Sequence, residues 1–166
     1  MRQNMNTQKR YLAFLITLSA VFFTEAVFAA EPGPIPPELA ALEAKAKLQD
    51  PIVSWCKGAF VPGKPSGFAV AVSRNKTEGR YLIIDSLGQV SEIAAFTGGA
   101  DLNCYTAAEA KDLAKTIAEN ETTHGGIVPR YKSAVICVAQ DRSPTTLCWQ
   151  YSPKAKAFVK IGSWTT

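Results

Sequence analysis

The sequence predicts an α+β fold in which antiparallel strands form one or more β-meanders, with two helices packed on one face. Two segments repeat their apolar residues at helical spacing, whereas the other apolar runs are short and bounded by turn-forming residues. The chain also contains 4 cysteines, and an even number in an exported protein favours disulfide bonds. We therefore expect one α+β domain that holds two disulfides.

The first 29 residues are typical of a secretory signal peptide. Basic residues precede an apolar run at residues 11–23, and Val27 and Ala29 suit the positions before a cleavage site. Spanning a bilayer takes about 20 apolar residues, so a retained membrane anchor is the disfavoured alternative. Residues 30–37 then form a flexible Pro-rich leader, and residues 38–166 form a single domain. We expect export to the periplasm, with secretion to the medium as the alternative.

The domain begins with a predicted helix at residues 38–50, where Leu39, Leu42 and Ala46 recur at helical spacing. Pro37 suits the first helical position, and Pro51 disfavours helical geometry in the residue before it. Four strands are predicted next, separated by turn-rich segments, at residues 52–61, 68–74, 80–86 and 90–96. Residues 97–103, which contain two glycines, are expected to form a loop.

A second helix is predicted at residues 106–122, because Thr106 and Glu109 have the spacing of a capping box. Gly125 or Gly126 could supply its left-handed C-terminal cap. Three more strands are predicted at residues 133–140, 145–152 and 156–164. Each half of the chain thus reads as a helix followed by a meander. A tandem αβββ repeat is one interpretation, and chance similarity of two meanders is the other.

The turn between two predicted strands fixes a cysteine pairing. If the turn is centred between Arg142 and Ser143, Cys137 lies directly opposite Cys148. Neighbouring strands place such partners about 4.5 to 5.5 Å apart, a separation that a disulfide can bridge. By elimination, Cys56 pairs with Cys104. One disulfide with two free thiols is an alternative. Metal binding and a redox role are disfavoured, because no two cysteines have the close spacing of zinc ligands or of a CxxC motif.

The last predicted strand suggests a binding surface. Alternation along the strand places basic and aromatic residues on one face, namely Lys154, Lys156, Phe158, Lys160 and Trp164. Exposed aromatic residues beside charges are typical anchors of a protein interface. The alternative is that the lysines are ordinary solvated side chains or protect a sheet edge from pairing with another chain.

The sequence contains no convincing catalytic constellation. His124 is the only histidine, and we expect it in the last turn of the second helix. Asp85 and Glu92 could lie near each other across a hairpin, but we expect them to be solvated carboxylates, as we do for Asp101. We expect no metal and no cofactor.

The charge of the chain also limits its partners. The chain has 18 basic and 14 acidic residues, and removing the signal takes away three basic and one acidic residue, which leaves a net charge of +2. This charge is too small to indicate nucleic-acid binding. We also expect no stable membrane insertion of the mature chain. Its oligomeric state is left open.

These observations favour an exported, non-enzymatic binding module that engages a protein partner, in the manner of an inhibitor or an envelope accessory protein. The basic residues suit an acidic partner. One alternative is an envelope protein that binds a small molecule. The other is a small hydrolase or thiol-redox enzyme that uses His124 or the pair Cys137 and Cys148.

Overall fold

The computed structural model describes residues 33–75, 77–140 and 143–165. It shows an α+β fold with two antiparallel sheets, which confirms the predicted fold class. The first sheet has the order β1-β2-β3-β4, with β1 at Ile52–Gly58, β2 at Gly67–Ser73, β3 at Glu78–Ile84 and β4 at Val90–Thr97. The second has the order β5-β7-β8-β9-β6, with β5 at Ala100–Tyr105, β6 at His124–Ile127, β7 at Val135–Gln140, β8 at Thr145–Ser152 and β9 at Ala157–Thr165.

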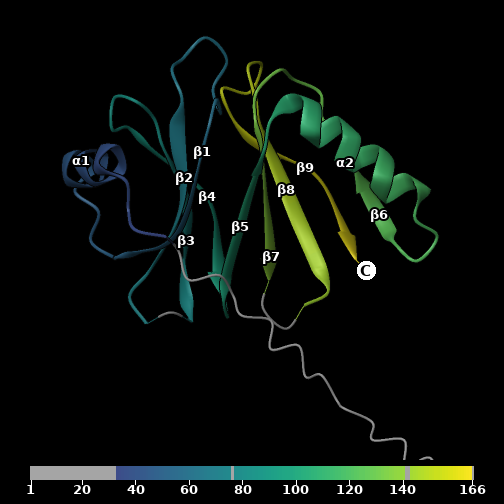
Figure 1. Cartoon of the computed structure of the whole chain (residues 1–166), viewed down its shortest axis with the longest axis horizontal. Coiled ribbons are helices and arrows are strands. Elements are labelled where there is room, and N and C mark those ends of the chain that lie inside the picture. The colour runs from purple at the N-terminus through teal and green to yellow at the C-terminus, as the bar shows by residue number, and fades with distance from the viewer. Residues whose placement is uncertain (1–32, 76, 141–142, 166) are drawn as a thin grey trace, which may run out of the picture.

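The two helices lie on the outer faces of different sheets (Figure 1). Helix α1, Pro37–Ala46, packs through Leu39 on the apolar face of the first sheet. Helix α2, Ala107–Glu119, packs through Ala110 and Ile117 on the second sheet. The expectation of two helices on one face therefore differs from the structure. The strands divide into two sheets, and each sheet has an outer apolar face that a helix covers.

A third apolar cluster lies between the two sheets. The first sheet contributes Tyr81 and Phe96 to it, and the second contributes Leu102, Ile136 and Trp149. The strands β2 and β3 carry buried residues on both of their faces, since one face meets α1 and the other meets this inner cluster. Burial on both faces explains why these segments are nearly continuous apolar runs in the sequence.

The helix ends follow local sequence signals. Helix α1 has Pro37 at its first turn and ends where Lys47 adopts a left-handed conformation, with a φ of 53°. The predicted capping box of α2 is present, because Thr106 accepts a hydrogen bond from the Glu109 N–H and the Glu109 carboxylate accepts one from the Thr106 N–H. Two hydrogen bonds from Thr106 lower the pKa of the Glu109 carboxyl below its ordinary value.

Both predicted disulfides are present, and in the described residues no cysteine is free. Cys137 lies opposite Cys148 in the β7–β8 hairpin, as the turn predicts, with a Cα–Cα distance of 4.1 Å. The bond between Cys56 and Cys104 joins β1 of the first sheet to β5 of the second. Two disulfides indicate an exported or otherwise oxidising compartment.

Two short strands were not expected from the sequence. Strand β5 occupies part of the predicted loop at residues 97–103, and it pairs with β7 over its whole length. Helix α2 ends at Glu119, with Asn120 as its cap, so Gly125 and Gly126 do not cap it. They belong instead to β6, which pairs with the end of β9.

The predicted repeat is not tested by these elements. Each half contains a helix and a three-stranded meander, formed by β2, β3 and β4 in the first sheet and by β7, β8 and β9 in the second. The strand after α1 lies next to its meander's first strand, whereas the strand after α2 lies next to the last strand. The αβββ repeat therefore stays a prediction.

The predicted signal peptide, residues 1–29, lies outside the described residues, and so does the start of the predicted leader at residues 30–32. In the described part of the chain, no helix is long and apolar enough to span a membrane.

Candidate binding surface

A β-bulge divides the predicted lysine and aromatic face of the last strand. Trp149 pairs with Lys160, but its neighbour Cys148 pairs with Gly162, so Ile161 is an extra residue in β9. An extra residue reverses the alternation of side chains beyond it. Phe158 therefore packs toward the cluster between the sheets, whereas Trp164 packs toward α2. The prediction that Phe158 and Trp164 share one face is wrong for this reason.

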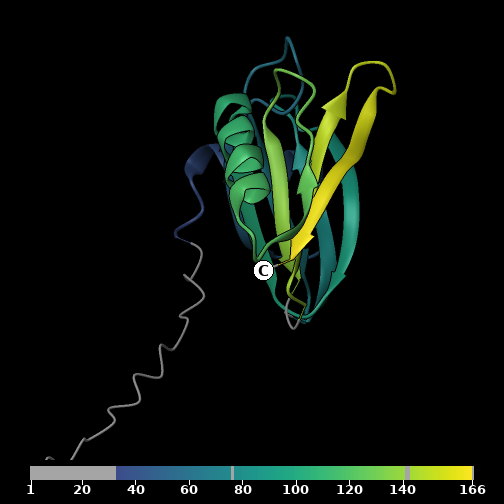
Figure 2. The ribbon, with the colours of Figure 1, turned by 90° about the vertical axis from the view of Figure 1, so that its right-hand side faces the viewer.

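Two of the predicted lysines also lie outside the strand. Lys154 and Lys156 belong to the turn between β8 and β9, and Lys156 has a positive φ of 51°. Lys160 is on β9 itself, and all three lysines are exposed. The hairpin that carries them extends beyond the part of the second sheet that α2 covers (Figure 2).

Two further cations lie on the loop between β6 and β7. This loop contains the exposed residues Arg130 and Lys132, and it reaches the same end of the molecule as the β8–β9 turn (Figure 1). We call the set Arg130, Lys132, Lys154, Lys156 and Lys160 the basic loop surface. None of these residues forms an ion pair within the described parts of the chain.

A fully buried glutamine fixes this loop to the hairpin. Gln150 on β8 has 0% exposure and accepts hydrogen bonds at its Oε1 from the backbone N–H groups of Arg130 and Tyr131. Its Nε2 donates to the carbonyl oxygens of Tyr131 and Ser133, at 2.9 Å each. All four hydrogen-bonding positions of the amide are therefore used, which holds the backbone of Arg130 at a defined place on the sheet.

A second contact joins the loop to the β8–β9 turn. The Tyr131 hydroxyl lies 3.1 Å from the Ser152 hydroxyl, which also accepts a hydrogen bond from the N–H of Ala155. On the hairpin, the Tyr151 and Phe158 rings form an edge-to-face pair with centroids 5.4 Å apart. Both rings are half-buried.

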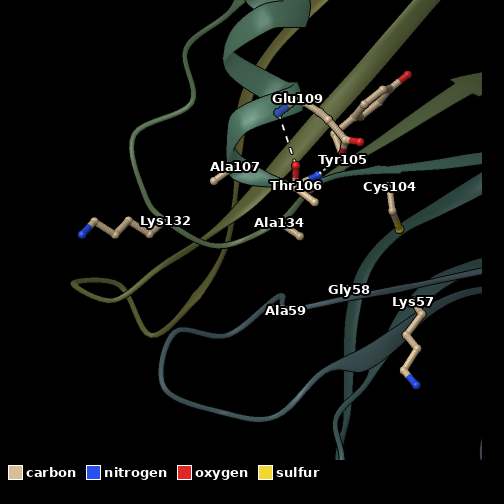
Figure 3. A pocket seen from close by; sticks show the side chains of 10 residues that line it. All are labelled: Lys57, Gly58, Ala59, Cys104, Tyr105, Thr106, Ala107, Glu109, Lys132 and Ala134. Atoms are coloured by element: carbon tan, nitrogen blue, oxygen red, sulfur yellow. Dashed lines mark hydrogen bonds between the residues drawn. The ribbon is translucent and has the colours of Figure 1, made fainter.

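A pocket of about 240 Å³ lies between the end of β1 and the start of α2 (Figure 3). The charged groups at its border point away or are already engaged. Lys57 extends away from the pocket and forms an ion pair with Glu38 at 2.6 Å, and Lys132 also points outward (Figure 3). Glu109 is used in the capping box of α2. Ligand pockets usually exceed about 300 Å³ and contain convergent polar groups, so this pocket supports the small-molecule alternative poorly.

The acidic residues considered for catalysis serve the fold. Burial would raise the pKa of Asp85, but the hydrogen bonds from Lys64 and from the N–H groups of Gln89 and Leu87 outweigh it and lower the pKa. Asp85 thereby closes the β3–β4 turn. Glu92 instead lies near Arg80, at 3.6 Å. These contacts place the two carboxylates in separate polar networks.

The positions of His124, Cys137 and Cys148 do not favour the hydrolase or the thiol-redox enzyme that would use them. His124 is exposed on β6, where its carbonyl oxygen lies 3.5 Å from the Thr165 hydroxyl. It was expected in the last turn of α2, and that prediction is wrong because the chain has already left the helix at Asn120. Cys137 and Cys148 are buried beneath α2, at 1% and 0% exposure.

The other buried polar groups of the described residues form no reactive cluster. Burial and the nearby charge of Asp101 raise the pKa of Tyr81 to about 12, so its hydroxyl stays protonated at neutral pH. In the described ranges, no group of three or more His, Cys, Asp or Glu residues could hold a metal ion.

Comparison of the chain with models of protein families, with curated proteins and with solved structures finds no match.

Proposed function

We propose that the mature chain is an exported, non-enzymatic binding module of the periplasm that engages an acidic surface of a protein partner. The observation that carries this proposal is the basic loop surface. It gathers five cations on the β6–β7 loop, the β8–β9 turn and β9, and the loop is hydrogen-bonded to the β8–β9 hairpin. A loop whose backbone is already held in place loses little freedom on binding, which favours a docking role.

The charge distribution supports an acidic partner. Between residues 122 and 165, the described residues carry these five cations and no Asp or Glu. In the parts of the chain that the structure describes, five of the eight other cations form an ion pair with an acidic residue, as Lys57, Lys64 and Arg80 do. An unneutralised cluster raises the rate of association with an acidic surface and disfavours basic partners.

The periplasmic location is part of the proposal and agrees with the signal-like start of the sequence. Two disulfides and two packed sheets covered by helices suit a protein that presents a defined surface to a partner in an oxidising compartment. This is the character of an inhibitor or an envelope accessory protein.

Affinity capture from an envelope extract at physiological salt tests the proposal. The variant Lys154→Gln/Lys156→Gln/Lys160→Gln removes three charges from the basic loop surface. The control Lys45→Gln/Lys47→Gln/Lys111→Gln removes three exposed charges from the end of α1 and from α2. We expect the wild type and the control to capture the same acidic protein and the first variant to lose it. Equal capture by both variants, or no specific partner for the wild type, would contradict the proposal.

A further inference from the structure

We propose that the free edge of β9 at residues 157–160 receives an extended acidic segment of the partner, which adds to the second sheet as a strand. This inference rests on the proposed function and specifies how the basic loop surface would bind. It commits to main-chain pairing with β9 as the source of affinity and to carboxylate side chains as the source of selectivity.

The edge is free because β6 is short. Strand β6 pairs with β9 only from Gly162 to Thr165, and the N–H of Val128 then bonds the carbonyl oxygen of Ile161. Residues 157–160 pair with β8 on one side, whereas among the described residues no strand pairs with them on the other. The loop that follows β6 instead crosses toward Gln150 of β8.

The direction of the backbone groups on this edge follows from the neighbouring hairpin. Cys137 and Cys148 have a Cα–Cα distance of 4.1 Å, which marks a pair that does not exchange backbone hydrogen bonds. The backbone groups of Cys148 therefore point toward β9, and by alternation so do those of Gln150 and Ser152. Their partners Val159 and Ala157 bond back to β8. The N–H and C=O groups of Phe158 and Lys160 consequently point outward, where an incoming strand could pair with them.

The surrounding side chains indicate the chemistry of that strand. Lys154 and Lys156 lie at one end of the free edge, and Lys160 lies on it. Among the described residues, no Asp or Glu forms an ion pair with these lysines. Lysines on an edge protect it from apolar and basic strands, but the same charges favour a strand that carries carboxylates. Edge protection and selective strand addition are therefore compatible.

The first test uses the full mature chain with no substitution. Backbone amide exchange, followed by NMR, should show fast exchange at Phe158 and Lys160 and slow exchange at Ala157 and Val159. An eight-residue peptide of alternating Glu and Val should slow exchange at Phe158 and Lys160, and a peptide of alternating Lys and Val should not. Slow exchange at all four amides without peptide, including protection by a second copy of the chain, would overturn the inference. Unchanged exchange in the presence of the acidic peptide would also overturn it.

The second test separates the backbone contact from the charge. Lys160→Gln removes the charge but keeps the N–H, whereas Lys160→Pro removes both and leaves the hydrogen bonds to β8 in place. We expect Lys160→Gln to weaken binding of the acidic peptide two- to threefold and Lys160→Pro to weaken it about tenfold, with thermal unfolding as the check that both variants fold. Equal weakening by the two variants would overturn strand addition. If strand addition were overturned but Lys154→Gln/Lys156→Gln still weakened capture of the partner, the proposed function would stand without strand addition.

Discussion

At the scale of single residues, the charges of the basic loop surface can be identified from the sequence, but the side chain that positions the loop is harder to predict. The five cations can be read from the chain, but Gln150 lies within a strand pattern where a polar residue would ordinarily face solvent. Its role appears only when the β6–β7 loop is placed over β8. A local pattern cannot predict this contact because its partners lie 17 to 20 positions away.

Replacing Gln150 by Ala should therefore destabilise the protein by about 3 kcal/mol, because four hydrogen bonds to buried or half-buried backbone groups are lost. Urea unfolding gives this change in free energy. The exposed Gln89 provides the matched control, and its replacement by Ala should cost less than about 0.5 kcal/mol. Equal, small losses in both variants would show that the Gln150 contacts do not hold the loop.

Asp85 should give the protein an acid-sensitive contribution to stability. Its pKa is lowered in the folded state, so this contribution is fully present above the unfolded pKa of about 3.9 and is lost as the pH falls through the folded pKa. We expect Asp85→Asn to be less stable by about 1 kcal/mol at neutral pH and to lose less stability than the wild type below pH 4. Urea unfolding at several pH values measures this, with the exposed Glu92→Gln as control. Parallel pH curves for the wild type and Asp85→Asn would contradict the assignment.

At the scale of elements, strong local signals predicted most helices and strands. The capping box located the start of α2, and the turn between Arg142 and Ser143 predicted the register of β7 against β8. Strands β5 and β6 were missed because the glycines that precede β5 and those within β6 are more typical of loops and helix caps. The bulge at Ile161 was missed because the alternation of apolar residues continues up to it.

The pairing of β6 with β9 depends on the absence of a side chain at Gly162. A Cβ at this residue would collide with the carbonyl oxygen of Gly126, and its φ is 150°. Gly162→Ala should therefore destabilise the protein by about 2 kcal/mol and increase amide exchange in β6. Gly126→Ala is the matched control, because a Cβ there has no atom within 4 Å. Similar losses from both substitutions, measured by unfolding, would show that β6 pairs without this close approach.

At the scale of the whole molecule, the sequence predicted the fold class and both disulfides but not the division into two sheets. The division depends on which strands pair across long stretches of sequence. In the order β5-β7-β8-β9-β6, for example, β6 pairs with β9 and not with β5 or β7, the strands that precede and follow it in the chain. The candidate surface was predicted in part. Its three lysines were identified, whereas Arg130 and Lys132 join them only through the tertiary contacts of the β6–β7 loop.

The disulfide between Cys56 and Cys104 joins the two sheets and closes a sequence separation of 48 residues. The chain-entropy model gives a stabilisation of about 4 kcal/mol for a loop of this length. Cys56→Ser/Cys104→Ser should lower the free energy of unfolding by about that amount. Both cysteines are only half-buried, so the substitutions leave the core intact. A loss below about 1 kcal/mol would mean that the core between the sheets holds them together without the bond.

The central claim is that the basic loop surface is where this protein meets its partner. Site-specific photo-crosslinking in the envelope tests it directly, with a photoreactive amino acid in place of Lys156 in the β8–β9 turn and, in a second variant, in place of Lys111 on α2. The account predicts a discrete crosslinked partner from position 156 and none from position 111. A crosslink from position 111 alone, or equal crosslinks from both positions, would contradict it.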